Sequence, residues 1–239
     1  LSTVSYYRLS GYFKPFQQSH DKSHPFKPNT SFEQIWHIYT FDRELRLLIA
    51  DALERIEIAL RTALSNVLAV RYGNCWYLSD APFTQAWFIA KHPKQEPPRD
   101  FFRREVNEIC LRQKDKEAFI KHYYNQYDEP FYPPSWMLLE CLSFGKCTSL
   151  FRNLKKLSDK KAICEIFNYH PRVIESCLEP LRYIRNLSAH HARLWNRWFV
   201  IVPKHIKAFG LVSKQPRTLH QQLIVLNQLN QAISPGSHW

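Results

Sequence analysis

The residues best suited to chemistry gather in one short segment, residues 182–197, with the sequence RYIRNLSAHHARLWNR. It holds four arginines, two histidines and two asparagines, and it has no Asp or Glu. Arginine offers a permanent charge and a planar fork for a phosphate, and histidine exchanges protons near neutral pH. Such a set could cleave RNA without a metal. A base would take the proton of a ribose 2′-OH, the oxygen would attack the adjacent phosphate, and a cation would stabilise the developing charge.

The spacing limits which of these side chains can act together. A helix turns by about 100° per residue, so Asn186 and His190, four residues apart, share a face. Arg185 and His190 are five residues apart and diverge by about 140° on a straight helix. They can meet only if the helix ends or bends between them, or if two copies of the segment face each other. A basic helix with solvated arginines and ordinarily hydrogen-bonded histidines would show the same pattern.

Positive charge is concentrated in the same part of the chain. The 239 residues carry a formal net charge of +12. Residues 1–140 hold 18 basic and 17 acidic residues, a balance of +1, whereas residues 141–239 hold 15 basic and 4 acidic residues, a balance of +11. A one-sided basic surplus suggests a polyanion as partner, either nucleic acid or an anionic membrane. A general solubility charge is the alternative.

Missing patterns exclude several other classes of protein. The five glycines are too far apart for the phosphate-binding loops of ATP, GTP or NAD enzymes. Neither H-E-x-x-H nor C-x-x-C occurs, so we expect no metal site, no cofactor, and six reduced, mostly buried cysteines in a cytoplasmic protein. The Glu33/His37 pair is more typical of a helix surface than of a metal site. Residues 218–239 lack charged side chains but are too polar to insert into a membrane, and no signal peptide is visible.

A long amphipathic helix over residues 29–73 is the clearest structural signal. Thr30 and Glu33 form a capping box, apolar residues recur at steps of three and four, and Gly73 supplies a stop. About forty residues at 1.5 Å each span about 60 Å, a length that favours a bundle or a dimer seam.

Shorter helices are expected in the rest of the chain, separated by irregular loops rich in proline and aromatic residues. Pro171 is well placed to begin the helix that carries the Arg/His segment, and Pro180 should kink or split it. Residues 199–202 could form a strand. Further helices are expected over residues 100–125 in two pieces, from a cap at Ser135, after a turn at Phe144-Gly145, from Ser158, and over residues 218–233.

The predicted fold class is therefore all-α, a helical bundle around the long helix. We divide it into an N-terminal arm that packs on the core (residues 1–30), a helical domain that carries the Arg/His segment (residues 31–200), and a basic connector with an amphipathic helix (residues 201–239).

Several blocks of the sequence resemble one known family. Residues 185–190 match the R-x(4–6)-H motif of the HEPN superfamily, and the string through Arg197 resembles the Abi-like (AbiD/AbiF) family of bacterial abortive-infection proteins. Other blocks agree in the same order. These are SYYRLSGY at 5–12, FDRELR at 41–46, Arg55, Glu57 and Arg61 on the long helix, PSW at 134–136 and SFG at 143–145.

The resemblance implies an all-helical HEPN fold and a toxin-like, metal-independent endoribonuclease of phage defence, commonly a homodimer with a composite active site. Some relatives pair with a small structured RNA. Carried over to this chain, Arg185 and His190 would be catalytic and Asn186 would orient or contact the phosphate. His191 is the alternative histidine, because the superfamily also allows R-x(5)-H; we favour His190 because it shares a face with Asn186.

Two other functions stay open from the residues alone. The chain could be a non-catalytic RNA-binding module that holds a partner RNA, or a helical interaction protein whose long helix dimerises. We expect RNA and a second copy of the chain as partners, and no membrane. The candidate residues for supporting the site or contacting RNA are Arg193 and Asn196, together with Lys155, Lys156, Lys160, Lys161, Arg182 and Arg197.

Overall fold

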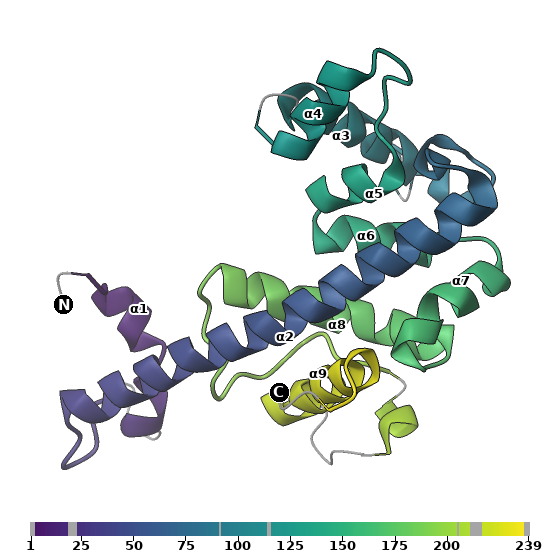
Figure 1. Cartoon of the computed structure of the whole chain (residues 1–239). Helices are drawn as coiled ribbons and strands as arrows, with labels where there is room; N and C mark the ends of the chain where they lie inside the picture. Colours follow the sequence, from purple (N-terminus) through teal and green to yellow (C-terminus); the bar gives the residue numbers. More distant parts are fainter. Residues whose placement is uncertain are drawn as a thin grey trace.

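A computed structural model describes residues 3–18, 23–90, 92–113, 116–204, 206–210 and 217–236. Parts of the predicted N-terminal arm and C-terminal connector, residues 19–22 and 211–216 among them, lie outside these ranges. Within them the chain forms helices and short turns with only isolated β-bridges, which confirms the all-α class. The helices are α1 (Tyr6–Ser10), α2 (Phe32–Tyr72), α3 (Pro98–Gln113), α4 (Ala118–Gln126), α5 (Ser135–Leu138), α6 (Phe144–Arg152), α7 (Leu157–Cys164), α8 (Pro171–Ala189) and α9 (Leu219–Ile233) (Figure 1).

Helix α2 is the axis of the fold and runs across the whole molecule (Figure 1). Its 41 residues confirm the predicted long helix, which ends at Gly73 with φ of 88°. The predicted capping box of Thr30 and Glu33 is wrong by one residue. Ser31 is the N-cap, and its side chain and that of Gln34 bond each other's backbone N–H groups. Thr30 with Glu33 and Ser31 with Gln34 both fit the capping-box pattern. The structure uses Ser31 and Gln34, and the backbone of Ser31 has the extended conformation typical of an N-cap.

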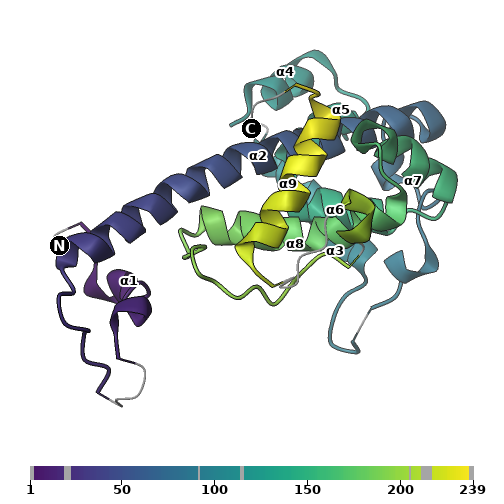
Figure 2. The same cartoon turned by 90° about the horizontal axis from the view of Figure 1, so that it is seen from below.

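Two hydrophobic clusters form along α2. The larger one buries its central and C-terminal parts against α5 to α9, with α9 crossing α2 and α8 (Figure 2). The N-terminal third projects beyond this body with α1 beside it (Figures 1 and 2). There a small cluster of Leu9, Tyr12, Phe13 and Ile35 is buried, and Trp195 packs against it. Trp195 therefore joins the Arg/His segment to the N-terminal end of α2.

Helix α8 carries the first half of the Arg/His segment. It begins at Pro171, as predicted, and continues through Pro180 to Ala189, so the predicted split is wrong. Cys177, Leu178 and Leu181 are buried on either side of the proline. Their packing holds the helix together, because most helical stability in proteins comes from a buried face and not from local propensity.

Several shorter elements differ from the sequence expectation. No strand forms over residues 199–202: Phe199 N–H donates to the carbonyl of Arg217 at 2.8 Å, but the part of the chain that the structure describes holds no strand to pair with them. Phe144 and Gly145 begin α6 instead of forming a turn, and α7 begins one residue before Ser158. Ser135 is the first residue of α5 and not its cap, because its hydroxyl lies 3.3 Å from that of Ser65 on α2.

The remaining helices follow the prediction. Residues 98–126 form two helices, α3 and α4, and Thr218 caps α9. All six cysteines are unpaired, and four of them are buried. Among the described helices, none combines the length and the apolar character needed to cross a bilayer.

Candidate functional site

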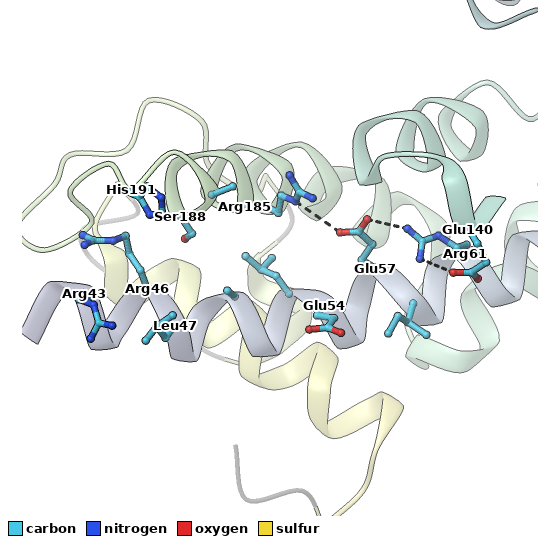
Figure 3. Close-up of a pocket in the computed structure, with 14 residues that line it drawn as sticks. Arg43, Arg46, Leu47, Glu54, Glu57, Arg61, Glu140, Arg185, Ser188 and His191 are labelled. Atoms are coloured by element: carbon cyan, nitrogen blue, oxygen red, sulfur yellow. Dashed lines mark hydrogen bonds and ion pairs between the residues drawn. The ribbon is translucent and has the colours of Figure 1, made fainter. Parts of the chain in front are cut away.

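An open cleft of about 710 Å³ lies between one face of α2 and the C-terminal end of α8 (Figure 3). The two helices contribute nearly all of its walls. Its lining residues are Arg43, Arg46, Leu47, Ala50, Leu53, Glu54, Glu57, Ile58, Arg61, Glu140, Arg185, Ser188, Ala189 and His191. Part of the Arg/His segment therefore lies across from the long helix, in a cleft that is open to solvent.

Arg185 lies in the middle of this cleft. Its Nε atom is 3.8 Å from Oε2 of Glu57, a long ion pair, and the side chain is 42% exposed. Glu57 is also held by Arg61, whose Nη2 donates to Oε1 at 3.0 Å, and Arg61 reaches Glu140 as well (Figure 3). Among the described contacts of Arg185, none involves its two terminal nitrogens. They remain available to bind a phosphate in the forked geometry that arginine favours.

The two histidines follow directly after the end of α8. His190 is the C-cap, and its N–H donates to the carbonyl of Asn186 at 3.0 Å. His191 has a positive φ of 56°, which turns the chain, and it lines the cleft together with Arg185. Neither His190 nor Asn186 lines the cleft. The helix thus ends between the arginine and the histidines, as a meeting of these groups requires, and both Arg185 and His191 line the cleft, with Arg185 turned toward Glu57 (Figure 3).

Ser188 lies between Arg185 and His191 along the chain, and sequence reasoning missed it. The residue is 7% exposed, and its hydroxyl has no hydrogen-bond partner among the described residues. The hydroxyl points from α8 toward α2, and Ser188 is among the residues that line the cleft (Figure 3). An unpaired buried hydroxyl costs about 1–3 kcal/mol. The signal for it was its position one helical turn after Arg185, on the same face.

Backbone contacts with the N-terminal region hold the rest of the Arg/His segment. Arg8 Nη1 donates to the carbonyl of His191 at 2.9 Å, and the guanidinium of Arg193 donates to the carbonyl of Gly11. The guanidinium of Arg193 therefore helps to hold the segment against the N-terminal region. Asn196 is exposed and has a positive φ of 48°.

The other predicted RNA contacts lie away from the cleft or have partners within the protein. Lys160 donates to Glu175 and to the carbonyl of Arg152, and Arg182 pairs with Glu179. Arg197 donates to the Arg193 carbonyl and to the Tyr183 hydroxyl.

Three of the predicted lysines are exposed, and they lie near the C-terminal end of α2, outside the cleft. Lys155 and Lys156 precede α7, and Lys161 lies on it. Lys156 lies over the ring of Tyr72 at the C-terminal end of α2, and Lys160 of α7 pairs with Glu175 in the first part of α8. The cleft, in contrast, is lined by Arg185, Ser188 and Ala189 at the other end of α8. These three lysines of the basic half of the chain are therefore not gathered around Arg185.

Neither a reactive cysteine nor a metal site is supported by the described residues. Burial raises the pKa of Cys147, Cys164 and Cys177 to about 12, so these thiols stay protonated and unreactive at neutral pH. Within the described ranges no three His, Cys, Asp or Glu side chains come together as metal ligands. The cleft offers instead an arginine, a histidine and an unpaired hydroxyl.

Comparison with known proteins gives one match. A protein-family model described as Abi-like protein matches residues 1–196, which include α1, α2, α8 and nearly all of the Arg/His segment. No curated protein and no solved structure matches the chain.

Proposed function

The chain belongs to the Abi-like protein family, so it is an abortive-infection protein of phage defence, and from this premise we propose that it cleaves RNA without a metal. One observation carries the proposal: Arg185 and His191 line the same cleft, and the unpaired hydroxyl of Ser188 lies in it as well. Within this one cleft Arg185 can bind a phosphate and His191 can move a proton.

The proposed reaction is a transesterification. The terminal nitrogens of Arg185 bind the two non-bridging oxygens of a phosphate and stabilise the charge that develops there. The histidine takes the proton of the 2′-OH, the 2′ oxygen bonds to phosphorus, and the bond from phosphorus to the 5′ oxygen breaks. The imidazolium then gives its proton to the leaving 5′ oxygen. The products carry a 2′,3′-cyclic phosphate and a 5′-OH.

The lining of the cleft favours His191 as this base. The sequence favours His190 because it shares a helical face with Asn186, and that prediction remains the alternative. His190 belongs to the helix end, where its N–H caps the carbonyl of Asn186, whereas the left-handed turn at His191 directs the chain back toward α2.

We propose single-stranded RNA as the substrate and a second copy of the chain as the protein partner. An attack by a 2′ oxygen in line with the leaving group requires a strand free to bend. The projecting end of α2 supports dimerisation, since Phe41 and Leu47 on it are 52% and 59% exposed. A small structured RNA is a further proposed partner, and no cofactor is needed.

A second candidate function is RNA binding without cleavage. The cleft is lined by four arginines and three glutamates, so its net charge is only +1, and Glu57 already pairs with Arg185. The exposed lysines near α7 could then hold a partner RNA while the cleft remains structural.

A substrate with one cleavable site separates the two functions. Purified protein in EDTA is mixed with a single-stranded RNA, and the cleavage site is mapped. A matched RNA then carries a 2′-deoxy nucleotide at that position. We expect cleavage of the first RNA, with 2′,3′-cyclic phosphate ends, and none at the deoxy position of the second. Binding of both RNAs without cleavage would establish the second function.

A further inference from the structure

One buried carboxylate joins the long helix to the Arg/His segment. Asp42 lies on α2 and is 0% exposed. Its Oδ2 accepts hydrogen bonds from the Tyr12 hydroxyl and from Arg46 Nη1, both at 2.5 Å. Burial, followed by the hydrogen bond to this carboxylate, raises the pKa of Tyr12 to about 12. A neutral phenol and a charged guanidinium therefore both serve Asp42 as donors.

The same carboxylate accepts two backbone amides of the Arg/His segment. Oδ1 lies 3.1 Å from the nitrogen of Leu194 and 2.7 Å from that of Trp195. Leu194 is separated from Asp42 by 152 residues. These contacts lie just after His191, so they determine where the chain goes once it leaves α8.

The backbone of this segment needs such an anchor. His191 and Asn196 have φ of 56° and 48°, the left-handed region that residues other than glycine seldom adopt. Such conformations persist only where the surrounding structure holds them. The amides that Asp42 holds lie between the two left-handed residues.

We infer that Asp42 is a positioning residue for the cleft: it fixes the loop after α8 so that His191 lines the same cleft as Arg185. The inference rests on the proposed function. Asp42 does not line the cleft itself and acts through the backbone of Leu194 and Trp195, while its partner Arg46 does line the cleft. A carboxylate suits the role because both of its oxygens only accept hydrogen bonds.

The isosteric substitution Asp42→Asn tests this. An asparagine keeps one acceptor oxygen, and its NH₂ group cannot accept the amides or the hydroxyl that a carboxylate oxygen binds. We expect cleavage at saturating RNA to fall about 100-fold, the scale expected when a reacting group is misplaced by about 1 Å. RNA affinity should change less than about threefold, because Arg185 and the lysines near α7 are untouched.

Asp159 is a matched control within the same chain. It is 1% exposed and accepts hydrogen bonds from Arg71 Nη1 at 2.5 Å and from the Tyr72 hydroxyl at 2.6 Å. It holds α7 to α2 and makes no described contact with the Arg/His segment. Asp159→Asn should therefore lower the melting temperature while the cleavage rate stays within about threefold of wild type. Equal rate losses in the two variants would overturn the inference.

Amide hydrogen exchange provides a readout that does not depend on cleavage. In the full chain, Asp42→Asn should speed exchange at Leu194 and Trp195, and Asp159→Asn should not. If wild type cuts no RNA, the proposed function fails, and exchange alone decides whether Asp42 holds the loop. Unchanged exchange at both amides, or an unchanged rate in Asp42→Asn, would contradict the inference. Should Asp42→Asn not fold, Tyr12→Phe removes one donor from the carboxylate, and the same two readouts apply with smaller expected changes.

Discussion

The two ends of α2 are built on the same trio of residue types and serve different purposes. At the C-terminal end, Asp159 accepts from Tyr72 and Arg71 and fastens one packed helix to another. At the N-terminal end, Asp42 accepts from Tyr12 and Arg46 and also from two backbone amides. A buried, hydrogen-bonded aspartate is therefore not in itself a sign of function. We expect such an aspartate to affect function where, like Asp42, it holds a backbone segment in a conformation that residues other than glycine seldom adopt.

Charge and chemistry are also divided between the two ends. The exposed lysines lie near Asp159, whereas the cleft near Asp42 is almost neutral, with four arginines against three glutamates. An RNA that contacts both regions would run along α8. We therefore expect substitutions at the Asp42 end to change the rate of cleavage, and substitutions at the Asp159 end to change affinity or stability.

The largest difference between two neighbouring residues is expected for the histidines. His191→Ala should lower cleavage by about 100-fold, because a positioned general base contributes about 10²–10⁴-fold. His190→Ala should stay within about threefold of wild type, since its described role is a backbone cap. Single-turnover rates measured in parallel decide between them. A large loss in His190→Ala with little change in His191→Ala would mean that His190 is the base and that lining the cleft does not identify the catalytic histidine.

Two buried serines, Ser188 at the cleft and Ser135 beside the C-terminal part of α2, allow a comparison in which each variant loses one hydroxyl. Ser188→Ala should lower the cleavage rate about five- to tenfold, the effect of one lost hydrogen bond to substrate, without lowering the melting temperature. Ser135→Ala breaks the contact with Ser65 and should lower stability by about 1 kcal/mol with no change in rate. Thermal melting and cleavage assays on both variants test the pair. A loss of stability in Ser188→Ala would mean that its hydroxyl serves the fold.

The lysines at the Asp159 end should act on binding alone. Replacing Lys155, Lys156 and Lys161 together by Ala should weaken RNA binding and flatten its salt dependence. The slope of log K against log salt should fall by about 0.7 for each lysine that contacts a single-stranded phosphate. Cleavage at saturating RNA should not change. Affinities measured at several salt concentrations provide the test, and an unaltered slope would place the RNA elsewhere.

The smallest expected effect concerns alkaline pH. The folded protein raises the pKa of Tyr12 from 10 to about 12, so the folded state favours the protonated phenol. The stability that this group contributes is fully present below pH 10 and is lost as the pH rises from about 10 to 12. Tyr12→Phe should therefore show a shallower loss of stability over that range than wild type. Denaturant unfolding at successive pH values checks this, and parallel curves would show that Tyr12 does not titrate in this way.

Much of the fold could be predicted from the sequence because its signals are local. The periodicity of α2 extends over forty residues, and Pro171 and Gly73 mark helix ends by their own chemistry. The errors arose where a partner decides the outcome. Residues 199–202 have the composition of a strand but meet no strand among the described residues, and Pro180 stays helical because its neighbours are buried.

The candidate site was predictable only in part. The Arg/His segment is visible as a pattern, and helical geometry shows that Arg185 and His190 diverge. Two features that decide the site are not local. The left-handed turn at His191 depends on contacts with α1 and α2, and Asp42 meets Leu194 across 152 residues. Ser188 matters only because α2 covers it.

The most direct test of the account is the cleavage rate of the full chain on single-stranded RNA in EDTA, for wild type, Arg185→Ala and Arg71→Ala. Each variant loses one arginine that pairs with an acid of the fold, Arg185 with Glu57 in the cleft along the middle of α2 and Arg71 with Asp159 at its C-terminal end. The account predicts that Arg185→Ala lowers the rate about 10²–10³-fold, the scale of losing one group that stabilises transition-state charge, and that Arg71→Ala leaves it within about threefold. Equal rates in wild type and Arg185→Ala, or no cleavage by wild type, would contradict it.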